Sequence, residues 1–221
     1  ASNTKSGRPQ KCLNLYSFVR RPHICRDHSM KQAKLLTTQE RKRLTAVIEH
    51  KRYATRNHTA VALSFYAGLR ACEIAALCIA DVFDETGAVR DTIHLTAAQT
   101  KGSDSATVLV NKKLATQLRR YAQQYPQRIP QPNAALIFSA KGGSFTAQTI
   151  VNLFQNLYKA AGIAGASSHS GRRQFVTELA DKGINARVIQ ALARHKHLNT
   201  TMRYIDLNEN KLRCAVELVD Y

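Results

Sequence analysis

Several residues spread along the chain have side chains suited to chemistry on a phosphodiester. Breaking such a bond requires a nucleophile, cations that neutralise the charge building on the non-bridging oxygens, and an acid that protonates the leaving oxygen. Tyrosine supplies a nucleophile, arginine a permanent cation, and histidine or lysine a proton. The candidates, in chain order, are Arg70 with Glu73, Lys101, His169 with Arg172, and His195 with Tyr204.

Two of these groups are pairs with helical spacing. His169 and Arg172 are three residues apart, so that on a helix both side chains reach one phosphate. Arg70 and Glu73 have the same separation, which lets the carboxylate orient the guanidinium. Each pair alone has a plainer interpretation, as a solvated basic face or a surface ion pair. Their combination in one chain is what favours a site.

The order of these groups resembles that of the tyrosine recombinases, the family that includes phage integrases and chromosome-dimer resolvases. The likeness extends from about residue 36 to residue 218, and four ordered blocks are far more specific than any single one. The blocks are Tyr66-Ala67-Gly68-Leu69-Arg70-Ala71-Cys72-Glu73-Ile74, Thr100-Lys101-Gly102, His169-Ser170-Gly171-Arg172, and Ala193-Arg194-His195 followed by Thr200-Thr201-Met202-Arg203-Tyr204.

The resemblance implies a site-specific DNA recombinase that cleaves and rejoins DNA. Arg70 and Arg172 would clamp the scissile phosphate, and Glu73 would orient Arg70. Tyr204 would attack the phosphorus to give a 3′-phosphotyrosyl bond and a free 5′-hydroxyl. Because the covalent link retains the energy of the phosphoester, rejoining would need neither ATP nor a metal ion, and no cofactor is expected.

The remaining roles are also implied by the resemblance. Lys101 would be the general acid toward the 5′-oxygen, and His169 would act as proton acceptor or phosphate donor. His195 would form a hydrogen bond with the phosphate. His197 competes with His195 for this role, and only the spacing of nine residues to Tyr204 selects His195.

Three further basic residues within or directly beside the blocks, Arg173, Arg194 and Lys196, are candidate DNA contacts. Two stretches here depart from the family's pattern. Gly171-Arg172-Arg173 stands where Leu-Arg-His is common, and Gly171 is expected to weaken its helix by about 1 kcal/mol relative to alanine. Arg194 replaces a glycine at a position where tight backbone packing is usual.

The composition points to a polyanionic partner. The 221 residues include 33 Lys plus Arg against 15 Asp plus Glu, a formal net charge of +18. Double-stranded DNA is the expected partner, and a membrane surface is disfavoured because the charge is spread along the chain rather than on one amphipathic helix. No apolar run approaches the roughly 20 residues that cross a bilayer, and no secretory signal is visible. A soluble protein of the bacterial cytoplasm, associated with the nucleoid, is therefore expected.

Five cysteines are an odd number in a chain large enough to fold without disulfides, which favours free thiols in a reducing compartment. Cys12, His23, Cys25 and His28 form a loose cluster of possible zinc ligands, but the chain has no close Cys-x-x-Cys pair. No metal site is therefore expected.

Apolar spacing predicts a mostly α-helical domain with a small antiparallel β-sheet, an α+β fold. Residues 37–40 offer a capping box for the first helix. Alternating segments at 91–96 and 106–110 flank turn residues and predict a β-hairpin, and a further short strand is expected at 136–138. Helices are expected at 37–48, 57–68, 73–77, 112–125, 146–160, 169–181 and 186–193, and across 200–204.

Residues 1–36 are polar and basic, and we expect a basic arm or interdomain linker there, with the catalytic domain at 37–221. Full-length family members carry a helical core-binding domain before the catalytic one, and this segment is too short for it. The chain is expected to be either an excised catalytic domain or a small member resembling fimbrial phase-switch recombinases. The arm either follows DNA phosphates or is a disordered linker.

The resemblance also implies assembly. Family members act as a homotetramer on two duplexes and exchange strands through a Holliday junction, and the free chain is expected to be a monomer. Within the tail at 207–219, Leu212, Val216 and Val219 have helical spacing. The tail would dock either on a neighbouring protomer or on its own core.

Two alternatives stay open. A non-catalytic DNA-binding regulator on the same fold would be expected to lack Tyr204 or an arginine of the site, and all are present. A type IB topoisomerase would share the chemistry but relax supercoils as a monomer, and the spacing of His195 and Tyr204 favours the recombinase. The sequence leaves open the DNA target and the outcome, whether integration, excision, inversion or resolution.

Overall fold

The computed structural model describes residues 32–100, 104–205, 209–217 and 219. Contacts divide the chain into two units, residues 1–31 and residues 32–221, and the first unit lies outside the described residues. The helices are α1 Thr38–Glu49, α2 Ala54–Ala67, α3 Ala71–Ala76, α4 Ile79–Val82, α5 Lys112–Gln124, α6 Ala147–Ala160, α7 Ser170–Asp181, α8 Ala186–Ala193, α9 Leu198–Met202 and α10 Glu209–Val216. The strands are β1 Thr92–Leu95 and β2 Ala106–Leu109, with 3₁₀ turns at Ala97–Gln99 and Pro126–Arg128.

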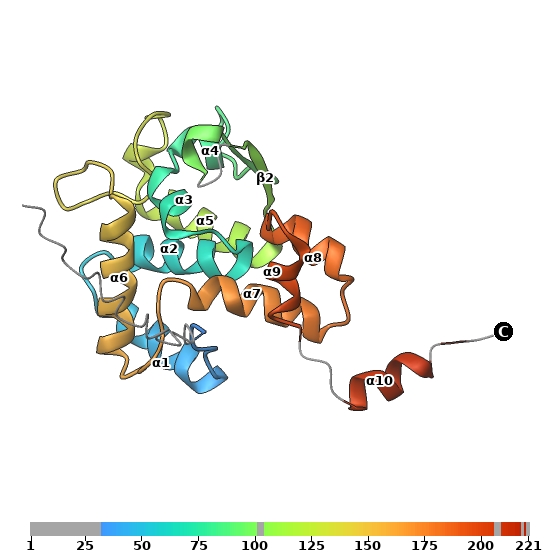
Figure 1. Cartoon of the computed structure of the whole chain (residues 1–221). Coiled ribbons are helices and arrows are strands. Elements are labelled where there is room, and N and C mark those ends of the chain that lie inside the picture. The colour runs from blue at the N-terminus through green and yellow to red at the C-terminus, as the bar shows by residue number, and fades with distance from the viewer. Residues whose placement is uncertain (1–31, 101–103, 206–208, 218, 220–221) are drawn as a thin grey trace, which may run out of the picture. The chain divides into compact units, whose positions relative to one another are not determined.

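Helix α2 is the element around which the others pack (Figure 1). It lies against α5 and α7, and it also contacts α1 and α3. Residues on several sides of α2 are buried, among them Ala60, Leu63 and Phe65, so its sequence is apolar and small rather than divided into two faces. An element buried in this way fixes the positions of the helices that carry the site.

The first helix begins where the sequence predicts. The Oγ1 atom of Thr37 accepts a hydrogen bond from the backbone nitrogen of Glu40 at 3.2 Å, and Oε2 of Glu40 accepts one from the backbone nitrogen of Thr37 at 2.9 Å. Two amides at the helix start are thereby satisfied. The predicted capping box is confirmed.

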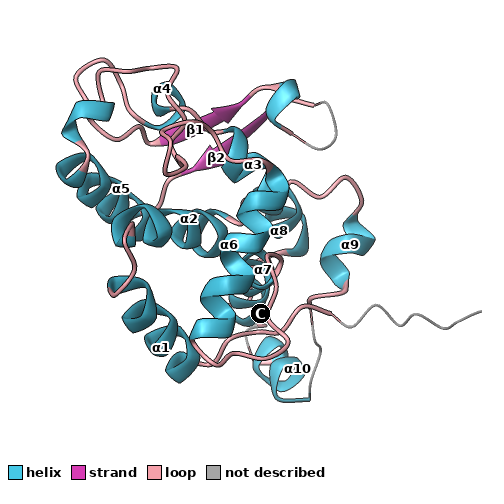
Figure 2. Cartoon of the chain, turned by 90° about the vertical axis from the view of Figure 1, so that its left-hand side faces the viewer, coloured by secondary structure: helices cyan, strands magenta, loops and turns pink. Residues whose placement is uncertain are grey.

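The predicted β-hairpin is also confirmed (Figure 2). Strands β1 and β2 run antiparallel, with Ile93 opposite Val108 and Leu95 opposite Ala106. Ile93, Leu95 and Val108 are buried, whereas His94 is exposed. One face of the hairpin therefore packs on the core, and the alternation seen in the sequence reports which face that is.

The prediction of a strand at 136–138 is wrong. These residues are buried, but of the three only Phe138 forms a bridge, with Ser144, and the other isolated bridge nearby joins Cys78 to Ala135, just before the predicted strand. Because each bridge is a single residue long, no ladder forms. The apolar run that predicted a strand reflects burial alone.

Close packing of α7 on α2 explains Gly171. A Cβ atom at this position would lie 2.7 Å from Cδ2 of Phe65 and would also collide with Oγ of Ser64. Glycine is what lets α7 approach α2 this closely, and the approach brings the next residue, Arg172, to the end of α2. Glycine lowers the helix propensity of α7, as the sequence predicted, but it permits the close contact between α7 and α2.

We expect Gly171→Ala to lower the free energy of unfolding by about 1–3 kcal/mol, because overpacking outweighs the better helix propensity of alanine. Denaturant unfolding followed by circular dichroism measures this. Gly143→Ala is the matched control, since a Cβ at Gly143 would have only Oγ of Ser139 nearby, at 4.0 Å. Equal effects of the two substitutions would contradict the packing argument.

Candidate active site

Arg70 directly follows the end of α2. Gly68 ends α2 with a left-handed conformation (φ 62°), and the turn makes Arg70 the N-cap of α3. Glu73, in the first turn of α3, is fully buried; it accepts hydrogen bonds from the backbone nitrogen of Arg70 at 2.8 Å and from its Nη1 at 2.6 Å. The Arg70 side chain stays 26% exposed. Its guanidinium is thus held in place and still accessible.

Arg172 lies in the first turn of α7 and is buried. Its Nη1 donates to the carbonyl oxygen of Gly68 at 2.6 Å, and its Nη2 donates to the carbonyl oxygen of Ala193. These carbonyls belong to the ends of α2 and α8, so Arg172 joins three helices. Burial, together with the charges of Arg70 and Arg194, lowers the pKa of Arg172 to about 9. The group is therefore still a cation at neutral pH.

His195 and Tyr204 are stacked, with ring centroids 6.0 Å apart and planes inclined by 21°. His195 is buried, and its Nδ1 is hydrogen-bonded to Oγ1 of Thr201 at 2.8 Å. Tyr204 follows α9, which ends at Met202 instead of continuing through 204 as the sequence suggested. Partly buried, the tyrosine packs against an apolar cluster formed by α7 and α8. Helices α7, α8 and α9, which lie next to one another in Figure 1, therefore position the segments that carry both residues.

The three predicted DNA contacts lie in different surroundings. Arg194 has its guanidinium inside the site, where Nη2 is 3.0 Å from Oε2 of Glu73. Lys196 is exposed at the edge of the same pocket. Arg173 lies elsewhere on α7, and its Nη1 donates to the carbonyl oxygen of Ala33 at 2.5 Å. A DNA contact by any of the three stays a prediction.

His169 is the exposed N-cap of α7, two residues before the buried Gly171 and three before Arg172. Lys101 lies outside the described residues. Thr100 and Asp104, the nearest described residues on either side of it, both line the pocket of Arg70. The role carried over to Lys101 therefore stays a prediction.

The pocket has a volume of about 360 Å³ and an excess of positive charge. The Glu73 carboxylate bonds to two guanidiniums, those of Arg70 and Arg194, while the hydrogen bonds of Arg172 described above go to carbonyl oxygens. At the rim, exposed Lys196 and Asp104 offset each other in charge. Such an arrangement suits an anion with several oxygens, as a phosphodiester has. The lining residues are Arg70, Glu73, Thr100, Asp104, Ser105, Ala106, Arg194, His195 and Lys196.

The cations also set the protonation of their neighbours. Burial alone would raise the pKa of Glu73, but Arg194 and then Arg70 hold it below its usual value, so the carboxylate is charged. Burial lowers the pKa of His195 to about 4, and the charges of Arg172, Arg70 and Arg194 act in the same direction. The imidazole is therefore neutral at pH 7, and with Nδ1 engaged by Thr201 its Nε2 is the atom left for a phosphate oxygen.

Within the described ranges, no three His, Cys, Asp or Glu side chains gather to hold a metal ion. Among the helices of the described part, none is both long and apolar enough to cross a membrane. Cys72 and Cys78 are free thiols. The loose cluster noted in the sequence lies outside the described residues; its members are Cys12, His23, Cys25 and His28.

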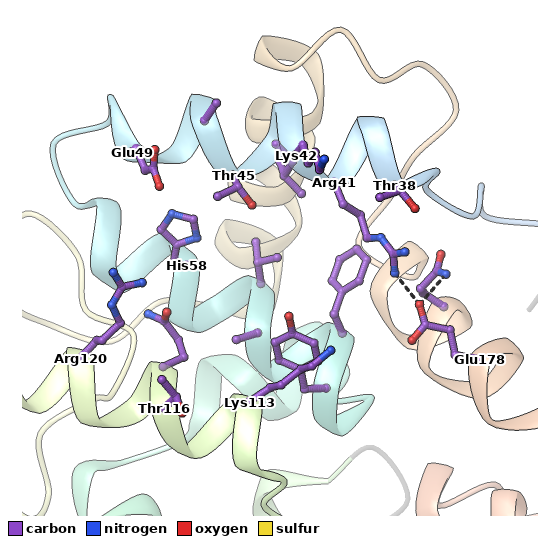
Figure 3. Close-up of a pocket in the computed structure, with 18 of the residues that line it drawn as sticks. Thr38, Arg41, Lys42, Thr45, Glu49, His58, Lys113, Thr116, Arg120 and Glu178 are labelled. Atoms are coloured by element: carbon purple, nitrogen blue, oxygen red, sulfur yellow. Dashed lines mark hydrogen bonds and ion pairs between the residues drawn. The ribbon is translucent and has the colours of Figure 1, made fainter. Parts of the chain in front are cut away.

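A second, larger cavity of about 890 Å³ lies between α1, α2, α5 and α7 (Figure 3). Its floor is apolar and includes Leu44, Val61 and Phe65, and an ion pair between Arg41 and Glu178 bridges α1 and α7 at one end. Its other charged or polar lining residues include Lys42, Glu49, His58, Lys112, Lys113 and Arg120. No motif in the sequence pointed to it, because four separate helices contribute to its walls. Its apolar floor and basic rim suit the binding of an apolar helix face that also carries negative charge.

Comparison with known proteins assigns the family. A model of the phage integrase family matches residues 34–211. The chain belongs to the phage integrase family. The matched range includes every residue of the pocket and of the His195–Tyr204 stack. It also includes the four helices that form the second cavity.

Individual relatives of this integrase-family chain are distant. Tyrosine recombinase XerA of Pyrococcus furiosus is 28% identical over 186 residues, which cover 83% of this chain and 61% of that protein. Tyrosine recombinase XerC of Nitrobacter winogradskyi is 29% identical over 158 residues, which cover 71% of this chain and 47% of that protein. The chain thus spans about half to three-fifths of the length of these relatives.

Solved structures confirm the predicted fold of the catalytic domain. A crystal structure of XerA recombinase has a TM-score of 0.67 at 26% identity, covering 85% of this chain and 66% of that chain. The XerH site-specific recombinase bound to difH substrate, a pre-cleavage complex, has a TM-score of 0.63 at 22% identity and covers 83% of this chain and 53% of that one.

We expect His195 to titrate near pH 4 in the folded chain, against about 6.5 when unfolded, because burial and the guanidiniums disfavour the imidazolium. As the pH falls, the unfolded chain then takes up this proton first. The stability gained from a neutral His195 is therefore present above about pH 6.5 and lost as the pH falls toward 4. Ring C–H chemical shifts in NMR measure the titration, and His195→Gln assigns the signal. A midpoint near 6.5 in the folded chain would contradict the described environment.

Proposed function

We propose that this chain is a site-specific DNA recombinase that cleaves and rejoins DNA through a 3′-phosphotyrosyl bond at Tyr204. One observation carries the proposal: the guanidiniums of Arg70 and Arg194 share the buried Glu73 carboxylate, Arg172 binds the carbonyl oxygen of Gly68 at the same turn, and the stacked His195 and Tyr204 lie at the end of the helix that Arg194 terminates. Family membership and relatives named tyrosine recombinases support it. So does the net charge of +18, which favours a polyanionic duplex.

In the proposed reaction, the Tyr204 oxygen forms a bond to the scissile phosphorus while the bond from phosphorus to the 5′-oxygen breaks. Arg70 and Arg172 neutralise the charge that builds on the non-bridging oxygens, and preorganised donors of this kind each contribute on the order of 10²-fold or more in rate. Neutral His195 donates a hydrogen bond from its Nε2 to one of these oxygens. Its stacking on Tyr204 holds the phenol next to the phosphate site.

Two protons must move in this reaction. In the roles carried over from the family, His169 accepts the phenolic proton and Lys101 protonates the leaving 5′-oxygen. One phosphoester is exchanged for another, so the reverse attack by a 5′-hydroxyl regenerates Tyr204 and needs neither ATP nor a metal ion. The position of His169 at the exposed start of α7, three residues from Arg172, is compatible with this role.

A regulator that only binds DNA and a type IB topoisomerase are the alternative functions. Retention of Arg70, Arg172 and Tyr204 in this chain argues against the regulator, because binding alone does not require a nucleophile. The names of the relatives favour a recombinase over a topoisomerase. Integration, excision, inversion and resolution share this chemistry and are equally compatible with the site.

We assign catalysis to residues 37–221 and the role of a basic arm or linker to residues 1–36. All the site residues lie in the first of these segments, and it falls almost entirely within the range of the family match. A DNA substrate supports the proposal that the protein acts at the nucleoid of a bacterial cytoplasm.

The expected assembly is a homotetramer on two duplexes, formed from monomers, with α10 of one protomer in the second cavity of a neighbour. On α10, Leu212 is 54% exposed and Val216 is 68% exposed, an apolar pair one helical turn apart. Glu209 and Glu217 bracket this pair in the sequence. Glu209 is paired with Arg213 on the same helix at 2.6 Å, so it is the apolar pair that matches the apolar floor of the cavity, with Glu217 left to meet its basic rim.

We expect Tyr204→Phe to bind duplex DNA like the wild type but to form no covalent adduct, because the nucleophilic oxygen is gone. The substrates are duplexes selected from a random pool by the wild-type chain and nicked at successive positions. SDS-resistant complexes, with and without EDTA, and peptide mapping measure the linkage. Tyr53→Phe, at a partly buried tyrosine that lines neither cavity, is the control and should keep the adduct. An adduct formed by Tyr204→Phe, or one that EDTA abolishes, would contradict the mechanism.

We expect the double substitution Leu212→Glu with Val216→Glu to keep binding of one duplex and to lose the tetramer, because two charges replace the apolar stripe. Analytical ultracentrifugation with the selected duplex measures the assembly. Leu109→Glu, at a 60% exposed leucine on β2, is the matched control and should leave the tetramer intact. Tetramers that survive the double substitution would rule out this role for α10.

A further inference from the structure

Arg194 has a backbone conformation that its side chain disfavours. It ends α8 with φ 56° and ψ 47°, and it is the one non-glycine residue with a positive φ in the described part of the chain. A Cβ atom makes this left-handed conformation unfavourable, and glycine adopts it without that penalty. The arginine side chain must therefore supply something that a glycine here would not.

Its guanidinium lies inside the site rather than on the surface. The side chain is only 10% exposed, and Nη2 donates to Oε2 of Glu73 at 3.0 Å and to the carbonyl oxygen of Gly68 at 3.3 Å. Nη1 donates to the carbonyl oxygen of Leu192 at 3.2 Å. The side chain thus connects the end of α8 with the end of α2 and the start of α3, segments more than 120 residues apart in the sequence.

The backbone of the same residue also acts on Arg70. Nη2 of Arg70 donates to the carbonyl oxygen of Arg194 at 3.2 Å, while its Nη1 donates to Glu73. The left-handed conformation is what carries this carbonyl to the end of α8 that faces Arg70. Arg70 is therefore held at two points, and both depend on Arg194, one through its carbonyl and one through the carboxylate that it shares.

Stability alone is a poor explanation for this arrangement. Besides the backbone strain, the Nε of Arg194 is buried without a hydrogen-bond partner among the described residues. A buried unpaired donor and a desolvated guanidinium both oppose folding. Strain of this kind gathers at functional sites, where the surrounding structure maintains a geometry that the reaction needs.

Sharing the carboxylate has an electrostatic consequence. If Glu73 paired with Arg70 alone, it would largely neutralise the guanidinium that is meant to meet the phosphate. A second guanidinium on Oε2 draws part of the negative charge away, so that Arg70 keeps an accessible, incompletely neutralised cation. Both arginines line the pocket, and the 26% exposure of the Arg70 side chain against 10% for Arg194 marks Arg70 as the more accessible of the two.

Resting on the proposed function, we propose that Arg194 is a positioning residue for DNA cleavage. Its guanidinium shares the Glu73 carboxylate with Arg70 and donates a hydrogen bond to the carbonyl oxygen of Gly68. These contacts align the turn that carries Arg70 with the turn that carries His195. It acts through Arg70 and need not touch the DNA. The reaction is therefore expected to depend on its planar fork as well as on its charge.

The test compares Arg194→Gly and Arg194→Lys with the wild type on the nicked, selected duplexes. We expect Arg194→Gly to lower the single-turnover rate of adduct formation at least 10-fold and to leave the Kd for the duplex within about 2-fold. Arg194→Lys keeps the charge but lacks the planar fork that reaches Glu73 and Gly68 together. We expect its rate of adduct formation to be at least 5-fold lower than that of the wild type. Circular dichroism establishes that each variant is folded. Lys182→Gly, at the exposed end of α7, is the control for removing one positive charge.

A double-mutant cycle separates positioning from a merely structural role. If Arg194 acts through Arg70, then in a chain that already carries Arg70→Lys, Arg194→Gly should lower the single-turnover rate of adduct formation by less than about 2-fold. Full recovery by Arg194→Lys, additive effects in the cycle, or a loss of duplex binding as large as the loss of rate would each overturn the proposal. A wild-type chain that forms no adduct would overturn the proposed function and this inference with it, whereas equal rates for wild type and Arg194→Gly would overturn the inference alone.

Discussion

Glu73 holds its carboxylate in a fully buried position, where water does not stabilise the charge. Two guanidiniums do so instead, and they come from segments 124 residues apart in the sequence. Arg70 lies in the turn between α2 and α3, and Arg194 lies at the end of α8. A buried carboxylate requires partners with good geometry. The position of this one group therefore fixes where the first and last blocks of the site meet.

The packing around α2 makes that meeting possible. Gly68 ends α2 in a conformation that turns the chain toward α3, and its carbonyl oxygen receives Arg172 from α7. Gly171 lets α7 approach α2 closely enough for this bond. Because Arg172 also binds the carbonyl oxygen of Ala193, the end of α8 is attached at the same point. Charge, packing and backbone conformation thus support a single arrangement that presents cations to an anion.

Features with a local cause were predictable from the sequence. The capping box at Thr37, the alternation around Ile93 and the spacing of Arg70 and Glu73 all depend on neighbours within a few residues, or on which face of a strand is buried. The burial of the Arg194 side chain in the site was not predictable from the sequence. Its partner Glu73 is 121 residues away, and a basic side chain is usually exposed. For the same reason, a cavity assembled from four helices left no sequence signal. The strand expected at 136–138 failed because burial, without a pairing partner, produces the same apolar run.

In the proposed reaction, guanidiniums from separate helices converge on one phosphate next to Tyr204. A crystal structure of the chain with a selected duplex, nicked at the cleavage site, and orthovanadate tests it most directly, because vanadate takes the five-coordinate geometry of phosphorus during the exchange. We expect vanadium bonded to the Tyr204 oxygen and to the 5′-oxygen, with Arg70, Arg172 and His195 at hydrogen-bond distance from the remaining oxygens. Vanadate bound away from Tyr204, or held without Arg70 and Arg172, would contradict it.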